Sequence, residues 1–287
     1  NLEAGKPQTV VTFGTSLTKV GAWVDQLRAV LEQNYPGQIT LVNGAQGGAN
    51  SDWGRGALDE KVLKHNPDTV LIEFSVNDAV ASRKTSVAHA RGNLENMIER
   101  ILQQNPDCEI ILQVMNPPVA HTKNKRPNLL AYNQMVRDVA KARGFQLIDH
   151  YPVWEKLLND DPLKFLFYVP DTIHPVREGA LQVITPTMLH ALGLRPGKPD
   201  LSEDAPCWKY LSQALMDKDK NRVITHAEFN NYWKKIFTNN DANEDGKLSA
   251  NEFEPQVLFE ALDADQDGQV TLDELLKVYA PHFERFK

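Results

Sequence analysis

The chain has 287 residues, of which 41% are hydrophobic and 24% are charged, and its formal net charge is −7. The sequence contains no basic run or stripe, which argues against nucleic-acid binding, and no apolar run near the roughly 18 residues that a membrane span requires. The acidic excess lies mainly near the C-terminus, because residues 206–287 carry 15 acidic and 10 basic residues while the remaining chain carries 23 and 21.

Residues 8–193 alternate between predicted strands and predicted helices. Short apolar, β-branched runs predict strands at 9–13, 39–43, 69–74, 110–115 and 146–149. Helical patterns fall at 22–32, 57–65, 85–104, 128–143 and 178–192. This alternation indicates a parallel sheet with helices on both faces, in which ligands bind beyond the carboxyl ends of the strands.

A Pro- and Gly-rich stretch follows this pattern and reads as a linker. From Cys207 onward the chain changes to a loop motif that occurs three times, which indicates a second, repetitive domain. We therefore predict a catalytic domain at 1–195, a linker at 196–206 and a small all-α domain at 207–287. A disulfide between Cys108 and Cys207 is one possibility, and two free thiols are the other.

Polar motifs follow the predicted strands. Ser16 comes two residues after Gly14, where a strand-to-helix turn could expose its hydroxyl, although this fragment taken alone favours a helix cap. Asn77 follows the third strand and could donate its amide to an oxyanion, or could end the strand in a turn. Asp171 lies three residues before His174 and could orient the imidazole as a base for a serine, or could simply cap a turn.

Taken together, these fragments resemble the SGNH (GDSL-type) hydrolases over roughly residues 7–193. The resemblance rests on Gly14-Thr-Ser-Leu17, a glycine loop at 43–51, Asn77-Asp78 and Asp171-Thr-Ile-His174. It implies a three-layer α/β/α flavodoxin-like fold, with Ser16 as nucleophile, His174 as general base and acid, and Asp171 as the orienting carboxylate. It also implies an oxyanion hole made by the Ser16 N–H, the Gly48 N–H and the Asn77 side chain, with Gly47 as the competing glycine.

One residue departs from the family pattern. Thr15 stands where the family usually has Asp, and this change removes a charge that helps to hold the nucleophile turn. A threonine hydroxyl can still form such a bond, so we expect the triad to be intact.

The substrate is less well specified. The segment 116–128 is polar and basic and offers no apolar cover of the kind that a lipase would need. We therefore expect small acyl esters, such as acetyl groups on a carbohydrate, with lysophospholipid or thioester hydrolysis as the alternative and a calcium-dependent adhesion module as the non-enzymatic one. Candidate residues for the rim of a binding cleft are Trp53, Arg55, Arg83, His121 and Trp154.

Three twelve-residue loops in the C-terminal region fit the EF-hand calcium pattern, which uses oxygen ligands at positions 1, 3, 5, 7, 9 and 12. Loop one offers Asp217, Asp219, Asn221, Val223, Thr225 and Glu228. Loop two offers Asp241, Asn243, Asp245, Lys247, Ser249 and Glu252. Loop three offers Asp263, Asp265, Asp267, Gln269, Thr271 and Glu274. We expect two or three calcium ions, with loop one weakest because Arg222 replaces the usual glycine.

The spacing of the loops leaves room for only one shared helix in each gap. An apolar residue at position 8 of each loop allows pairing, but the short gaps leave open whether the loops pair in the usual way. An acidic region with few large apolar residues favours a structural role for calcium, and gating of the esterase is the alternative. These repeats resemble those of secreted bacterial proteins, and the chain begins at Asn1, so we expect a secreted or periplasmic protein.

Overall fold

The computed structural model describes residues 5–195, 216–221 and 223–285. Its sheet has five parallel strands: β1 (Gln8–Gly14), β2 (Ile39–Asn43), β3 (Thr69–Glu73), β4 (Glu109–Val114) and β5 (Gln146–Asp149). The strand order is β2-β1-β3-β4-β5, which is the flavodoxin-like order with its switch point between β1 and β3. The predicted fold class is confirmed, and every strand begins and ends within two residues of its predicted position.

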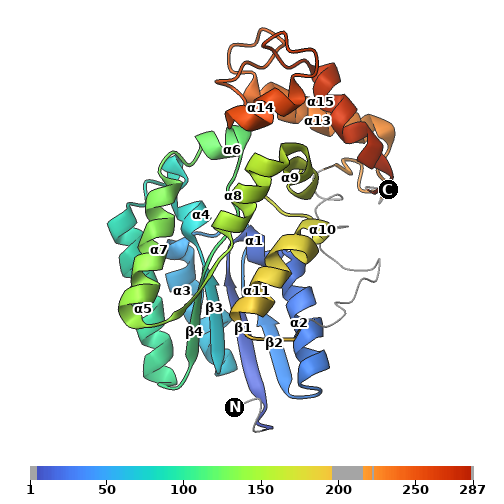
Figure 1. The fold of residues 1–287 in the computed structure, drawn as a ribbon. Helices are drawn as coiled ribbons and strands as arrows, with labels where there is room; N and C mark the ends of the chain where they lie inside the picture. Colours follow the sequence, from blue (N-terminus) through green and yellow to red (C-terminus); the bar gives the residue numbers. More distant parts are fainter. Residues whose placement is uncertain (1–4, 196–215, 222, 286–287) are drawn as a thin grey trace.

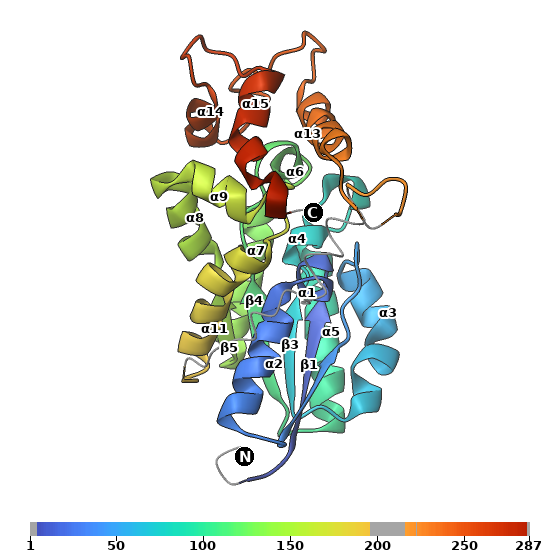
Figure 2. The same ribbon diagram turned by 90° about the vertical axis from the view of Figure 1, so that its right-hand side faces the viewer.

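Helices cover both faces of the sheet (Figures 1 and 2). On one face lie α3 (Ser51–Lys61), α5 (Val87–Gln104) and α7 (Leu129–Arg143), and on the other α2 (Ala22–Asn34), α8 (Tyr151–Asp160) and α11 (Thr185–Ala191). Successive strand residues point to opposite faces, so Val11 and Ile72 pack in one apolar cluster while Val10 and Leu71 pack in the other. Because both faces are buried, the strands are nearly continuous apolar runs.

Two predicted helices differ from the observed ones. The helix expected at 57–65 begins earlier, at Ser51, because the Asn50 side chain accepts the Trp53 N–H and the Asp78 carboxylate accepts the Ser51 N–H at 2.8 Å. The helix expected at 178–192 is divided into α10 (Arg177–Gly179), the π-helical η4 (Ala180–Ile184) and α11. The sequence analysis also missed α6 (Ala120–Asn124), α8 and α9 (Pro162–Tyr168). No helix among the described residues combines the length and apolarity needed to cross a bilayer.

The described C-terminal region contains α13 (His226–Asn240), α14 (Gln256–Leu262) and α15 (Leu272–Tyr279), followed by the short 3-10 turn η5 (Ala280–Arg285). One helix therefore fills each gap between loops, as the spacing predicts. Loops two and three pair through an antiparallel bridge between Leu248 and Val270, so the usual EF-hand pairing is present. The core is also richer in aromatic residues than we expected, since Trp233 stacks on Tyr279 with their ring centroids 3.5 Å apart.

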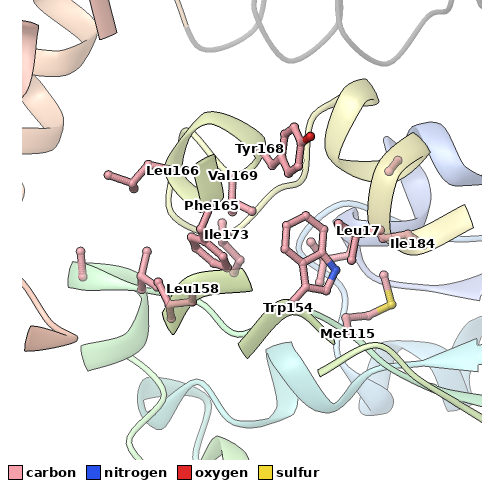
Figure 3. Close-up of a cluster of buried hydrophobic side chains, with 14 of the residues drawn as sticks. Leu17, Met115, Trp154, Leu158, Phe165, Leu166, Tyr168, Val169, Ile173 and Ile184 are labelled. Atoms are coloured by element: carbon pink, nitrogen blue, oxygen red, sulfur yellow. The ribbon is translucent and has the colours of Figure 1, made fainter. Parts of the chain in front are cut away.

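The C-terminal helices lie over the carboxyl ends of the strands (Figures 1 and 2). Helix α14 packs against α8 and α9, and α13 packs against α6. A single apolar cluster runs from the sheet through Trp154 and Phe165 to Trp233. Figure 3 shows its middle part, where the Trp154 indole lies between Leu17 and the side chains of α9. The predicted linker at 196–206 and Cys207 lie outside the described residues, so the domain boundaries and the disulfide stay predictions.

Candidate active site

The Ser16 hydroxyl is presented by the turn that follows β1. Thr15 caps the four-residue helix α1 (Ser16–Lys19), and its hydroxyl accepts the Leu17 N–H at 3.2 Å. A side chain at Gly14 would lie only 2.5 Å from the Glu73 carbonyl oxygen, so only glycine fits there. Ser16 thus lies at the end of β1, beside the switch point between β1 and β3, where ligands bind in sheets of this order.

The structure brings Ser16, His174 and Asp171 into one hydrogen-bonded chain. The Ser16 Oγ lies 2.8 Å from the His174 Nε2, and the His174 Nδ1 lies 2.5 Å from the Asp171 Oδ2. The other carboxylate oxygen of Asp171 accepts the backbone N–H groups of Ile173 at 3.2 Å and His174 at 2.7 Å. An ionised carboxylate only accepts hydrogen bonds, so the Nδ1 carries the proton and the Nε2 faces the serine as an acceptor.

The charges at this turn support that arrangement. Burial favours the neutral form of Asp171, but the nearby His174 and the backbone N–H groups outweigh it and lower the pKa of the carboxyl group. Burial likewise disfavours protonation of His174, but the adjacent Asp171 outweighs it and raises the pKa of the imidazole. The pair therefore stabilises a positive charge on His174, which is what a base needs when it removes a proton from serine.

The three N–H groups that the sequence predicts for the oxyanion hole belong to Ser16, Gly48 and Asn77. Among the residues that the structure describes, no acceptor is found for the backbone N–H groups of Ser16 and Gly48. Gly48 has a φ of +73°, a conformation that favours glycine. The Asn77 amide donates to the Ala49 carbonyl at 2.8 Å, and its oxygen accepts from Arg126 at 3.3 Å. Because arginine only donates, this contact fixes which way the amide faces.

A buried carboxyl group lies beneath the nucleophile turn. Glu73, at the end of β3, accepts the Thr15 N–H at 2.6 Å, the Thr15 hydroxyl at 2.9 Å and the Thr18 hydroxyl at 2.7 Å. Burial raises its pKa to about 7, although the three hydrogen bonds oppose the shift. The Thr15 hydroxyl thus helps to hold the turn, as we expected of this replacement for the family aspartate.

The candidate rim residues separate. Arg83 donates to the Gly48 carbonyl at 2.5 Å and so lies beside the glycine loop. Trp53 packs on Phe13, and Arg55 contacts Asn93 of α5 at 3.5 Å. Trp154 is wrongly predicted as a rim residue, because it is fully buried in the apolar cluster on α8 and α9. Its aromatic character reflects core packing.

His121 lies between the site and the C-terminal region, and its imidazole is close enough to Asp171 to feel the charge of that carboxylate. It lies where α6 meets the C-terminal region, and its backbone N–H donates to the Asn240 side chain at 2.6 Å. Burial, assisted by nearby Lys125, lowers the pKa of its imidazole to about 4. His121 is therefore part of the contact between the two regions.

Sequence reasoning missed several residues that hold the site. Asn116 donates to the Ile173 carbonyl at 2.9 Å, and the Thr122 hydroxyl donates to the Thr172 carbonyl at 2.8 Å. Arg126 donates to the Val76 carbonyl at 2.7 Å in addition to Asn77. All three donors belong to the polar segment 116–128. The sequence shows that this segment is polar, but its contacts follow no periodic pattern, so the sequence did not indicate which groups it would bind.

In loops one and three, three carboxylate groups lie close enough together to share an ion. The carboxylate oxygens of Asp263, Asp265 and Asp267 lie within 4.8 Å of one another, as do those of Asp217, Asp219 and Glu228. Gly246 and Gly268 have φ values of +81° and +83° at position 6 of loops two and three. The residues present therefore fit calcium, while Arg222 of loop one lies outside the described residues.

The sequence model of the GDSL-like lipase/acylhydrolase family matches residues 11–181. The chain belongs to this family. It is therefore a carboxylic ester hydrolase. A second model, of the EF hand, matches residues 256–279 and covers loop three, which implies calcium binding by the C-terminal region. No curated protein matches the chain.

Solved structures of other GDSL hydrolases and esterases share the fold of about two thirds of this chain. A protein described as a GDSL-like lipase from Parabacteroides merdae has a TM-score of 0.58 at 16% identity, covering 66% of this chain and 97% of its own. A catalytic variant of Axe2, an acetylxylan esterase from Geobacillus stearothermophilus, has a TM-score of 0.56 at 18% identity, covering 67% and 96%. A lipase/acylhydrolase from Enterococcus faecalis has a TM-score of 0.54 at 25% identity, covering 67% and 99%.

Proposed function

We propose that this GDSL-family hydrolase is a serine esterase that removes small acyl groups, such as acetyl groups, from carbohydrate by a Ser16–His174–Asp171 mechanism. The observation that carries the catalytic part is the unbroken chain from the Ser16 Oγ to the His174 Nε2 at 2.8 Å and from the Nδ1 to the Asp171 carboxylate. This is the geometry in which a neutral imidazole activates a serine hydroxyl.

In this mechanism, the Ser16 oxygen attacks the acyl carbon while the His174 Nε2 takes its proton. Asp171 stabilises the resulting imidazolium. The N–H groups of Ser16 and Gly48 and the Asn77 amide then donate to the tetrahedral oxyanion, and the loss of one such donor costs about 10²–10³ in rate. His174 returns the proton to the leaving alcohol, and a water molecule activated by the same base releases the acyl group from Ser16.

Support for a small polar substrate comes from the surroundings of the strand ends. Arg83 and Arg126 both lie on the oxyanion side of the site, through Gly48 and Asn77 respectively. Among the described residues, the exposed large apolar side chains are Leu130, Val153, Leu163 and Val223, and these belong to α7, α8, α9 and loop one. None belongs to the turns that carry Ser16, Asn77 or His174, which favours a short acyl group over a long acyl chain.

The test is turnover of p-nitrophenyl acetate by wild type and by Ser16→Ala. We expect Ser16→Ala to lose at least about a thousandfold in kcat. Equal rates for the two proteins would refute the catalytic assignment. A panel of acetylated oligosaccharides and long-chain acyl esters then addresses the substrate, and a preference for the long-chain esters would favour the lysophospholipase or thioesterase alternative.

We further propose that loops two and three each hold a calcium ion and that loop one is the weakest site. The oxygen ligands of position 12 are already turned into each loop, since Glu252 accepts the Ser249 N–H at 2.9 Å and Glu274 accepts the Thr271 N–H at 2.8 Å. A bound ion would stabilise the paired loops by neutralising their clustered carboxylates. We also propose that the protein is secreted or periplasmic, where EF-hand modules typically bind calcium at about 10⁻⁴–10⁻³ M.

A further inference from the structure

The two ends of calcium loop two contact the same short segment of the catalytic domain. We name residues 119–126, which lie between β4 and α7 and include α6, the docking turn. Asn240 directly precedes Asp241, the first ligand of loop two, and Glu254 lies two residues after Glu252, the last. Both residues bond to the docking turn, so the geometry of the loop and that of the turn are linked.

Asn240 and Glu254 form complementary contacts there. The Asn240 side chain is buried, accepts the His121 N–H at 2.6 Å and donates to the Ile236 carbonyl at 2.8 Å. The Glu254 carbonyl accepts the Ala120 N–H at 2.7 Å, and its carboxylate forms an ion pair with Lys123. Two consecutive backbone N–H groups of the docking turn are therefore satisfied by the C-terminal region.

The backbone of the docking turn is strained at this point. Ala120 is fully buried and has a φ of +49°, a left-handed conformation that residues with a side chain seldom adopt. Such a conformation persists only where the surrounding contacts impose it. The hydrogen bonds to Glu254 and Asn240 are made by the two peptide N–H groups that flank the Ala120 Cα, so they help to hold its conformation.

The docking turn in turn holds the turn that carries Asp171 and His174. The Val119 N–H donates to the Thr172 carbonyl at 3.0 Å, and the single proton of the Thr122 hydroxyl is shared between this carbonyl at 2.8 Å and the Val119 carbonyl at 2.7 Å. Thr172 lies between Asp171 and His174 and has a φ of +72°, which is strained for a β-branched residue. The position of the catalytic dyad therefore depends on contacts that the docking turn supplies.

A second connection runs from the docking turn to the oxyanion side. Arg126 donates to the Thr122 carbonyl at 2.8 Å within the turn, and then to the Val76 carbonyl and the Asn77 side chain. The guanidinium group is rigid and planar, so a displacement of the turn would be transmitted to the Asn77 amide. Both halves of the site, the dyad and the oxyanion donor, thus rest on the same segment.

We infer that Asn240 and Glu254 are positioning residues for the esterase site, and that calcium in loop two couples to catalysis through the docking turn. This inference rests on the proposed function. Without an ion, the carboxylates of Asp241, Asp245 and Glu252 repel one another, so the distance between the two ends of the loop is less well defined. An ion fixes that distance and with it the bonds of Ala120 and His121.

The first experiment compares Glu252→Gln, which alters the last ligand of loop two, with Glu244→Gln. Glu244 is exposed, lies in the same loop and occupies a non-ligand position, so it controls for the lost charge. At limiting calcium, we expect Glu252→Gln to have a kcat about tenfold lower than wild type with little change in KM. Its kcat should recover at high calcium. Glu244→Gln should behave as wild type at both calcium concentrations.

The second measurement does not depend on activity. Hydrogen exchange of the backbone amides in peptides covering 119–126 and 170–176 should slow on calcium addition in wild type and Glu244→Gln, and should remain fast in Glu252→Gln at the same calcium concentration. Exchange that is the same in all three proteins with and without calcium would overturn the inference, even if Ser16→Ala shows that the enzyme is a serine esterase.

A third comparison tests Asn240 directly at saturating calcium. Asn240→Leu removes the acceptor for the His121 N–H, Asn240→Asp keeps an oxygen there, and Asn239→Leu makes the same change at the exposed neighbouring position. We expect a loss of about five- to tenfold in kcat for Asn240→Leu alone. A loss that Asn240→Asp does not restore, in a protein with wild-type melting behaviour, would contradict the positioning role.

Discussion

Glu73 offers a test of the electrostatics beneath the nucleophile turn. Its carboxyl group is fully buried, and its pKa rises from 4.5 in the unfolded chain to about 7 in the folded protein. Because the folded state then binds the proton more tightly, the contribution of this group to stability is largest below pH 4.5 and is lost as the pH rises through 7. Between pH 5 and pH 8 this single group should remove about 2.5 kcal/mol from the free energy of unfolding.

Glu73→Gln removes the titration and keeps a side-chain oxygen that can accept the Thr15 N–H. We therefore expect the free energy of unfolding of the variant, relative to that of wild type, to be about 2.5 kcal/mol higher at pH 8 than at pH 5. The assay is urea unfolding of both proteins in calcium-containing buffer across this range. The difference between the two proteins cancels the titration of groups that do not interact with Glu73, whereas the charges of Asp78 and His174 are coupled to the Glu73 charge and contribute to it. A wild-type–variant difference that is constant from pH 5 to pH 8 would refute this account of Glu73.

Two further predictions concern the dyad and the metal. The kcat/KM of wild type should fall at low pH as His174 is protonated, with a midpoint above the ordinary histidine value of 6.5 because Asp171 raises the imidazole pKa. In Asp171→Asn the midpoint should move to lower pH, and the plateau of kcat/KM should drop about a hundredfold or more. A midpoint that does not move would argue against the Asp171 contact. Calcium should raise the melting temperature of wild type more than that of Glu274→Gln, which alters the last ligand of loop three. Calorimetry with and without chelator measures this rise. An equal rise in both proteins would contradict calcium binding by that loop.

The position of the C-terminal region changes the interpretation of the esterase domain. The segment 116–128 looked like an open polar loop, yet it contains α6 and bonds on one side to the C-terminal region and on the other to Thr172 and Asn77. The aromatic residues of α13 and α15 join the same apolar cluster as Trp154 and Phe165. The two regions are therefore packed together through both apolar and polar contacts.

Local sequence patterns were enough to predict the sheet, the order of the motifs and the calcium loops. Strand positions follow from local runs of β-branched and apolar residues, and a parallel sheet necessarily brings the ends of successive strands to one edge. Ser16 and Asn77 could thus be predicted to meet, because each follows a strand that the local pattern identifies. The Asp171–His174 pair comes after α8 and α9, which the pattern did not indicate, so its place at the site rested on the family resemblance. The EF-hand loops were equally clear, since all of their ligands lie within twelve residues.

The tertiary structure alone decided which residues support that site. Trp154 could lie on a rim or in the core, and only its packing against Phe165 and Leu17 places it inside (Figure 3). Arg126, Asn240 and Glu254 gave no signal, because polar contacts between distant segments have no period and depend on how the two regions dock. Local patterns record which face of an element is buried; they do not record which distant loop will meet its polar groups.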